Sequence, residues 1–266
     1  MPRKRTLFVT TLLLLRGADA FSLTAGKPAT WDSRAARRSS SAREDGDDVT
    51  ASLPPPPAGT GQRIWIAAGE GDTAALAPLL EQWSGREDVL NWSDEYGYTP
   101  LITAAFYGRL DAVRLLASTP GVDLQRGDGG DMSALLAAAY FGRTDVAAEL
   151  LRHVGLPEDV NRVDAFGFSA LHYACREGHV DIVCMLLSCP GIDPNLRCTE
   201  VGMTPLACAA FNGRAAVVAL LLSESGVDVD ARATAGSWAG RTALHFAQAA
   251  FCEEAAELIR AAGGRE

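Results

Sequence analysis

Lysine is almost missing from this chain: its 266 residues include only Lys4 and Lys27, both near the start. Residues 1–42 hold eight basic and two acidic side chains, a net +6, whereas the whole chain is formally −9, so the remainder carries −15. An acidic domain without a basic stripe argues against nucleic acid or an anionic membrane as a partner. A basic or amphipathic partner suits this charge better.

Motifs that carry chemistry are also missing. No C-x-x-C occurs among the six cysteines, nor any Cys/His spacing typical of zinc. The run from Gly127 to Asp131 has neither phosphate-loop spacing nor a calcium-loop pattern. We therefore expect no catalytic residue, no cofactor and no metal, and the chain is not predicted to be an enzyme. The cysteines are interpreted as small buried hydrophobes of a reducing compartment, with a Cys189–Cys198 bridge as the alternative.

The longest apolar stretch, Leu7 to Leu15, is nine residues, too short to span a bilayer, which takes about 20. The basic run from Pro2 to Arg5 precedes it, and Ala18-Asp19-Ala20 offers a small-x-small cleavage site. Residues 1–20 are thus predicted to be a signal peptide cleaved between Ala20 and Phe21, which leaves no membrane span in the mature chain.

Residues 21–43 are rich in Ser, Thr, Ala and Arg, as transit peptides are. A signal peptide, Phe21 directly after the cut and a basic hydroxylated stretch together resemble the bipartite leader of algal complex plastids. The resemblance implies a plastid destination through the endoplasmic reticulum, and secretion or retention in the endomembrane lumen is the alternative. Residues 44–61, with Pro54 to Pro57, are predicted to be a disordered linker. The triplet Asn91-Trp92-Ser93 is a glycosylation sequon whose occupancy stays open.

From residue 99 onward the chain repeats one pattern five times. Each copy opens with Thr or Ser, then Pro or Ala, then Leu, and the copies start 34, 36, 35 and 38 residues apart. The opening residues are Thr99, Ser133, Ser169, Thr204 and Thr242. A glycine stands nine residues after each of the first four, at Gly108, Gly142, Gly178 and Gly213. A degenerate earlier copy has Gln62 in the opening position and Gly71 in phase.

The best copy, Ser169 to Ala174, resembles the T-P-L-H-x-A signature of the ankyrin repeat, which has a period near 33. The resemblance implies an all-α ankyrin-repeat solenoid of about six helix–turn–helix repeats with short β-turn fingers, over residues 62–262. The repeats are expected near 62–93, 94–127, 128–163, 164–198, 199–236 and 237–262. It also implies that His172 and His245 make hydrogen bonds between repeats.

Local chemistry accounts for each repeat. Thr or Ser at the opening is a helix N-cap, proline at Pro100 and Pro205 suits the first helical position, and the later glycine ends the first helix. A tight turn at a glycine precedes most copies, and in the 128–163 copy Asp131 takes that place, since Asp tolerates a positive φ. That copy also lacks the proline and the histidine, and it is expected to be the weakest unit.

The recognition surface of ankyrin repeats resembles a cupped hand, formed by the finger turns and the ends of the first helices. Ten of the 13 aromatic residues between 94 and 262 fall in these positions. The partner-binding residues are accordingly predicted to be Tyr96, Tyr98, Phe106, Tyr107, Met132, Tyr140, Phe141, Phe166, Phe168, Arg176, Glu177, Met203, Phe211, Asn212, Trp238 and Arg241. The other interpretation is that rings beside the glycine pack repeat against repeat, and the sequence leaves both open.

The repeats predict a non-catalytic protein–protein interaction module, a scaffold or adaptor that acts as a monomer and binds its partner through an aromatic-rich concave groove. The alternative is a regulatory or chaperone-like subunit of an organellar enzyme or protein-targeting assembly. That alternative resembles the ankyrin-containing targeting factor of plastids, but the chromodomain-type modules of that family are not found in this sequence.

Overall fold

The computed structural model describes residues 59–153, 157–199 and 201–265. These belong to one compact unit, residues 56–266. The predicted signal peptide, the transit-like segment and almost all of the predicted linker lie outside the described residues.

Six helical pairs follow one another along the unit. The first helices are α2 (Thr60–Glu70), α5 (Pro100–Phe106), α7 (Ala134–Tyr140), α10 (Ala170–Glu177), α12 (Pro205–Phe211) and α14 (Ala243–Ala249). The second helices are α3 (Thr73–Gln82), α6 (Leu110–Ala117), α8 (Thr144–Leu151), α11 (Val180–Leu187), α13 (Ala215–Ser223) and α15 (Glu253–Ala261). The short helices α4 (Glu87–Leu90) and α9 (Pro157–Val160) and the 3₁₀ turn η2 (Gly236–Trp238) lie in the connections.

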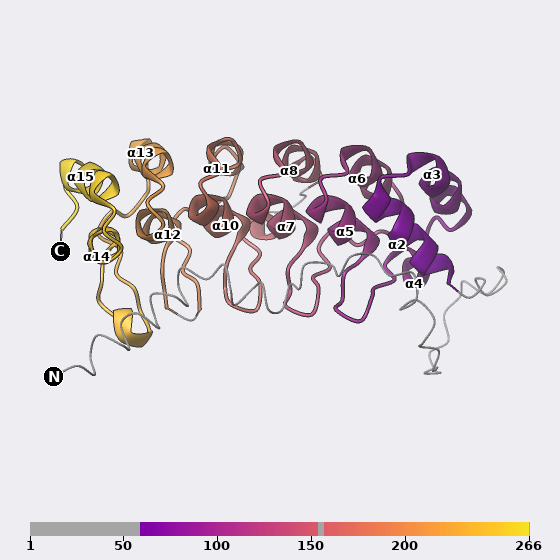
Figure 1. The fold of residues 1–266 in the computed structure, drawn as a ribbon, viewed down its shortest axis with the longest axis horizontal. Coiled ribbons are helices and arrows are strands. Elements are labelled where there is room, and N and C mark those ends of the chain that lie inside the picture. The colour runs from indigo at the N-terminus through magenta and orange to yellow at the C-terminus, as the bar shows by residue number, and fades with distance from the viewer. Residues whose placement is uncertain (1–58, 154–156, 200, 266) are drawn as a thin grey trace. The chain divides into compact units, whose positions relative to one another are not determined.

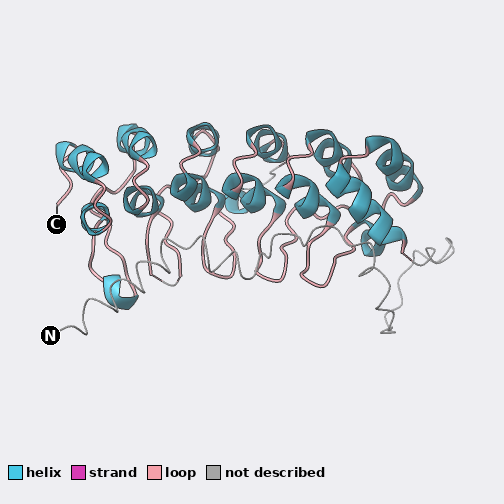
Figure 2. Cartoon of the chain, in the orientation of Figure 1, coloured by secondary structure: helices cyan, strands magenta, loops and turns pink. Residues whose placement is uncertain are grey.

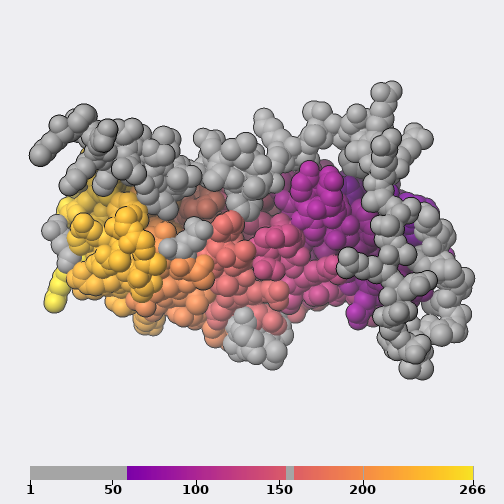
Figure 3. All heavy atoms as spheres, turned by 90° about the horizontal axis from the view of Figure 1, so that it is seen from below, coloured from indigo at the N-terminus to yellow at the C-terminus, as the bar shows by residue number. Residues whose placement is uncertain are grey.

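The pairs form two helical layers with a row of loops beneath them. The second helices make the outer layer, the first helices lie below it, and long loops project from the first helices as fingers (Figures 1 and 2). Seen from the finger side, the repeats succeed one another in chain order along the long axis (Figure 3). No strand occurs in the described residues, so the predicted all-α solenoid is confirmed.

The helices begin where their capping residues predict. The side chain of Thr99 accepts a hydrogen bond from the backbone N–H of Ile102, and Pro100 takes the first helical position. Ser169 caps α10 in the same way, and the ring of His172 closes a capping box with it. Helices α5 and α10 have only seven and eight residues, so the capping bonds satisfy a large share of their unpaired backbone groups.

Alanine gives the first helices their close packing. In α7 every residue from Ala134 to Ala139 is buried, and Ala137, Ala138 and Ala139 are fully enclosed. Leu116, Leu186 and other apolar residues of the second helices complete the core. Because a methyl side chain lets neighbouring backbones approach closely, the apolar residues of the six repeats form one continuous core instead of six separate ones.

The first repeat starts earlier than predicted. Helix α2 begins at Thr60 instead of residue 62, so the linker predicted to end at residue 61 is wrong by two residues. Gly61 is buried, and a Cβ on it would stand 2.4 Å from the Cβ of Trp92. Sequence reasoning missed this start because two glycines and a threonine are typical of a linker.

Two residues that replace glycine adopt its conformation. Asp131 has φ 61°, which confirms its predicted place in the turn. Phe251 stands where the other repeats have glycine and has φ 59°, while 82% of its side chain is exposed. A bulky residue in the left-handed region is strained, and no packing compensates for the strain here.

Side chains staple each repeat to the one before it at the helical turns. Each follows its own repeat glycine and hydrogen-bonds a carbonyl two residues before the preceding glycine. The pairs are Arg109 with Gly69 (3.1 Å), Arg143 with Phe106 (3.1 Å), His179 with Tyr140 (3.2 Å) and Arg214 with Arg176 (3.0 Å). A Cβ on Gly178 would lie 2.9 Å from Cδ of Arg214, so glycine leaves room for the staple.

Asparagine side chains clamp neighbouring repeats at the opposite end of the helices. Asn91 Nδ2 donates to the carbonyl of Gly121 (2.8 Å), and its Oδ1 accepts from the N–H of Asp123 (2.8 Å). Asn161 and Asn195 repeat both bonds at later junctions. Asn91 is 5% exposed. A glycan attached to its Nδ2 would break this junction, so the folded chain has no room for an occupied sequon.

The six cysteines form no disulfide. Cys198 is buried and Cys189 instead points its thiol at the carbonyl of Met185 (3.3 Å), so the alternative Cys189–Cys198 bridge is wrong. Burial raises the pKa values of the Cys175 and Cys208 thiols. These thiols are protonated packing groups. The prediction that the cysteines are small buried hydrophobes is confirmed for Cys175, Cys198 and Cys208, but it is wrong for Cys184, which is exposed, and for the half-buried Cys189 and Cys252.

Candidate partner-binding surface

An aspartate shapes the base of each of three fingers. Oδ1 of Asp94 accepts from the backbone N–H groups of Tyr96 (3.0 Å) and Tyr98 (2.8 Å). Asp128 and Asp164 make the same two bonds in the next repeats. Burial raises the pKa values of Asp94 and Asp128, although these backbone bonds oppose the rise. The carboxylates are therefore occupied inside their own fingers.

Backbone hydrogen bonds join one finger to the next. The donors are the N–H groups of Gly129, Ala165, Thr199 and Ala235, and the acceptors are the carbonyls of Tyr96 (2.9 Å), Gly130 (2.9 Å), Phe166 (3.1 Å) and Val201 (3.1 Å). Gly167, with φ 79°, allows the close approach, because a Cβ there would lie 2.4 Å from the backbone nitrogen of Thr199. The fingers therefore present one preformed surface.

The sequence-predicted residues divide into three groups by exposure. Tyr96 (59%) and Phe166 (41%) stand exposed on finger tips. The half-buried residues are Tyr98, Phe106, Tyr107, Tyr140, Phe141, Phe168, Arg176, Glu177, Asn212 and Trp238, and Arg241 is exposed. Met132 (3%), Met203 (4%) and Phe211 (2%) are buried.

The expectation that the three buried residues lie on the binding surface is wrong. Met132 and Met203 occupy the same position as Tyr98 and Phe168, directly before an N-cap, but a flexible thioether chain fits into the gap between repeats. Phe211 is covered by ring contacts with Trp238 and Phe246, each at 6.2 Å between centroids.

Rings from three repeats form one continuous aromatic row, which we call the central aromatic row. Consecutive contacts join Tyr107, Phe106, Phe141, Tyr140, Tyr173 and Phe168, with ring centroids 5.0, 4.2, 4.6, 5.4 and 5.5 Å apart. The structure thus brings six rings together at the ends of the first helices and the finger bases. The half-buried rings of the row pack repeats together and still present an edge to solvent, so the partner-binding interpretation stays a prediction.

Tyr173 belongs to the row, and sequence reasoning missed it. It is buried, and its hydroxyl donates a short hydrogen bond to Oδ2 of Asp164, the carboxylate that shapes the finger. Burial and this carboxylate raise the pKa of Tyr173. Its position inside a first helix is typical of a core residue. The only signal in the sequence was its hydroxyl group, which needs a hydrogen-bond partner when the ring is buried.

The last finger carries a second, separate cluster. Its η2 turn places Trp238 against Phe246, with ring centroids 4.9 Å apart and nearly parallel. Asn212 donates from Nδ2 to the carbonyl of Cys208 (2.8 Å), so its amide is partly occupied within its own helix. Arg241, exposed beside the same finger, adds a positive charge at this end.

The histidine that best matches the signature is a structural link. His172 is buried, with Nδ1 2.9 Å from Oγ of Ser169 and Nε2 3.2 Å from the carbonyl of Met203 in the next repeat, which confirms the implied inter-repeat bond. Burial lowers the pKa of His172 to about 4. The ring is therefore neutral at physiological pH and has both nitrogens engaged.

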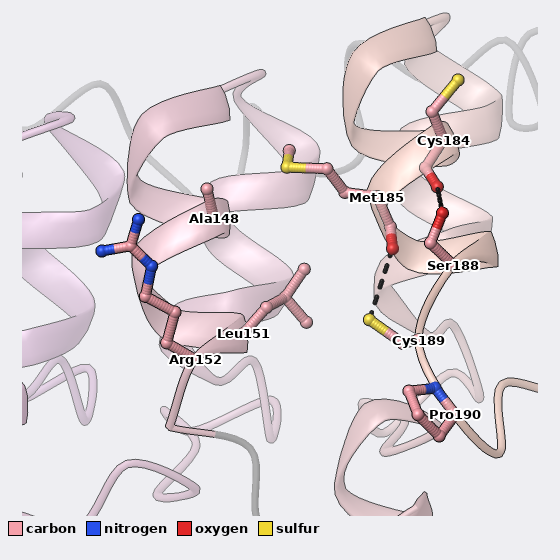
Figure 4. A pocket seen from close by; sticks show the side chains of 8 residues that line it. All are labelled: Ala148, Leu151, Arg152, Cys184, Met185, Ser188, Cys189 and Pro190. Carbon is pink, nitrogen blue, oxygen red and sulfur yellow. Dashed lines mark hydrogen bonds between the residues drawn. The ribbon is translucent and has the colours of Figure 1, made fainter.

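A shallow depression of ≈ 460 Å³ lies in the outer layer between α8 and α11. Leu151, Met185 and Pro190 line it together with Arg152, Ser188 and two cysteines (Figure 4). Ser188 and Cys189 both turn toward backbone carbonyls of their own helix, and Cys184 points away from Cys189 (Figure 4). Within the described ranges, no three Cys, His, Asp or Glu side chains gather as metal ligands would.

None of the helices in the described part of the chain has both the length and the apolar character needed to cross a bilayer.

Comparison with known families agrees with this architecture. Residues 119–198 match ankyrin repeats in three copies, and residues 96–126 and 201–234 each match an ankyrin repeat. Together the matches run through most of the solenoid. The chain belongs to the ankyrin repeat family.

Relatives share the repeats in much longer proteins. The chain is 31% identical over 133 residues to "Putative E3 ubiquitin-protein ligase XBAT31" of Arabidopsis thaliana, covering 47% of this chain and 28% of the relative. It is 37% identical over 131 residues to "Ankyrin repeat domain-containing protein SAT10" of Stachybotrys chartarum, covering 45% and 7%. "Ankyrin repeat family A protein 2" of Mus musculus is 40% identical over 78 residues, covering 29% and 23%. The chain thus spans less than a third of each of these relatives.

Proposed function

We propose that this chain is a non-catalytic interaction module that binds a partner protein along its fingers and the ends of its first helices. One observation carries the proposal: exposed and half-buried rings stand on a surface whose shape is fixed by hydrogen bonds between neighbouring fingers. Exposed aromatic side chains on a rigid scaffold are typical of binding hot spots, because large rings contribute contact area at low entropic cost. Membership of a repeat family whose stacks offer extended surfaces supports it further.

The partner is proposed to be basic or amphipathic. The chain after residue 42 carries −15, so a negatively charged partner is repelled at long range, whereas apolar side chains match the central aromatic row. The module is proposed to act as a monomer, and the leader resemblance supports a plastid destination, with secretion or the endomembrane lumen as the alternative.

Affinity capture with two matched variants tests the binding surface. The full chain, a Tyr96→Ala/Phe166→Ala variant and a Met185→Ala control are used to capture proteins from the source organism. Met185 is a half-buried apolar residue of the second helix α11, in the outer layer, away from the fingers and from the ends of the first helices. We expect the finger variant to lose the partner and the control to keep it.

The same experiment separates the two function classes. A partner that both variants retain would refute the proposed surface. A stable stoichiometric enzyme partner, lost only with the finger variant, would favour the regulatory subunit. Substoichiometric capture of many hydrophobic clients would favour a chaperone-like role.

A further inference from the structure

One arginine interrupts the aromatic positions at the centre of the surface. The residue two positions before the repeat glycine is Phe106, Tyr140 and Phe211 in three repeats, but Arg176 in the repeat between the last two. Arg176 is therefore a guanidinium in a place that the neighbouring repeats fill with a ring.

The rings around Arg176 remove it from water and fix its position. Its guanidinium carbon lies 5.1 Å from the ring centroids of Tyr140 and Tyr173 and 5.9 Å from that of Phe168. The side chain is 21% exposed, and its Nε donates to Oε1 of Glu177 (2.8 Å). Burial opposes the charge, yet Glu177 and the tyrosine rings keep the pKa of Arg176 above its ordinary value, so the group is a permanent cation.

The outer edge of this cation has no hydrogen-bond partner in the described part of the chain. Glu177 takes the Nε proton, and neither Nη group donates to any described residue. These nitrogens are not enclosed either, since they are not among the buried side-chain atoms that lack a partner. Two parallel N–H donors at a fixed orientation match the two oxygens of one carboxylate.

We propose that Arg176 binds the carboxylate of a Glu or Asp side chain in an amphipathic partner segment, whose apolar side chains lie on the adjoining central aromatic row. This assignment rests on the proposed function and names the partner's chemistry at its centre. A carboxylate fits better than a phosphate, because phosphate sites use several arginines, whereas Arg176 is already paired with the acidic Glu177. Since the domain is acidic, residues flanking this one acid in the partner are neutral or basic.

The assignment predicts a pairwise coupling that can be measured with selected peptides. A displayed library of random 12-residue peptides is selected on the immobilised full chain, and the strongest binder is synthesised with its acid and with the matching amide. Calorimetry gives the affinity of both peptides for the wild type, Arg176→Gln, Arg176→Lys and Arg162→Gln. Arg162 is an exposed arginine, and among the described residues Arg176 and not Arg162 lies over rings of the row. The Arg162→Gln variant has the same net charge as Arg176→Gln.

We expect every strong binder to carry an acid at one position between apolar residues. Changing that acid to the amide should weaken binding to the wild type and to Arg162→Gln by about 10- to 100-fold, as expected for a charge-assisted pair. On Arg176→Gln the same change should cost less than about twofold, because the guanidinium is gone. Arg176→Lys keeps the charge and the packing stem but not the paired donors, so an intermediate loss is expected. Melting curves establish that each variant is folded.

Other results overturn the assignment in distinguishable ways. Binders without an acid, or an equal amide penalty on Arg176→Gln, refute the role of Arg176 while the proposed function stands if Tyr96→Ala/Phe166→Ala still abolishes binding. Sensitivity to amidation of the peptide C-terminus instead assigns the carboxylate to a chain end and refutes the side-chain assignment. Peptides indifferent to the finger variant, or no binders at all, count against both proposals.

Discussion

Replacing Asn91 by alanine should detach the first repeat from the rest of the solenoid. The change removes two hydrogen bonds of 2.8 Å across the junction, and it leaves the carbonyl of Gly121 and the N–H of Asp123 without these partners in a part-buried place. Each lost bond is worth about 1 kcal/mol and a buried orphaned group costs more, so the junction should weaken by about 2–3 kcal/mol. With a urea slope of about 2 kcal/mol per molar, the first repeat should unfold about 1 M earlier.

Tryptophan fluorescence can follow this repeat separately. Three tryptophans, at positions 65, 83 and 92, lie in the first repeat. With Trp31 and Trp238 replaced by Phe in all proteins compared, fluorescence reports the first repeat and far-UV circular dichroism reports the whole stack. We expect Asn91→Ala to shift the fluorescence transition ahead of the dichroism transition, because neighbouring repeats couple only through their junction.

Asn195→Ala is the matched control, since it removes the same pair of bonds at an exposed junction. Water replaces the lost partners there, so about 1 kcal/mol of loss and coincident transitions are expected. If Asn91→Ala also gave coincident transitions at an unchanged midpoint, the clamp would carry no stability and the reasoning would be refuted.

Four further outcomes follow from the same structure and sequence. Amide hydrogen exchange should be faster over 127–153 than over 164–190, because the former lacks the histidine link; equal protection contradicts this. Phe251→Gly should raise the free energy of unfolding by about 0.5–1 kcal/mol in urea titration, since it relieves a left-handed φ and loses little packing. The pKa of His172 is about 4 in the folded chain and 6.5 in an unfolded one, so the free energy of unfolding should fall as the pH drops below 6.5, by up to about 1.4 kcal/mol per pH unit. His172→Gln should lack this contribution when urea midpoints at pH 7 and pH 5 are compared. A fluorescent fusion of residues 1–60 should enter the plastid, and Phe21→Ala should hold it in the endoplasmic reticulum or the plastid-surrounding extension; secretion of the unmodified fusion would reject the plastid proposal.

Local chemistry explains what the sequence could predict. Thr99 and Ser169 predict the starts of their helices, because an N-cap bond joins residues only three positions apart. Asp131 predicts a turn, because few residues other than glycine tolerate a positive φ. Such features need no knowledge of distant neighbours. The period of the pattern then supplied the arrangement of the repeats, because each unit packs on the next in the same way.

What the sequence could not predict depends on contacts between repeats. Met132 and Tyr98 occupy equivalent positions, yet only the methionine is enclosed, and that difference depends on side-chain shape and on the adjoining finger. The bond from Tyr173 to Asp164 joins a residue that looks like core to one that looks like surface. The role proposed for Arg176 depends on the rings of two repeats that surround its guanidinium, and the sequence does not show that these rings meet.

Bonds form at three different places where the repeats containing Asn161 and Asn195 meet the repeats that follow them: between the fingers, at the helical turns and at the asparagine junctions. Antiparallel helices put the turns and the junctions at opposite ends, and the fingers project away from both, so the three places are not collinear (Figure 1). Three such points determine a plane, and a repeat held at all three cannot tilt, twist or slide without breaking a bond. Losing the bonds at any one place leaves the line through the other two as a hinge axis. Cutting the bonds at one of these places by mutation should therefore set the direction in which the stack bends.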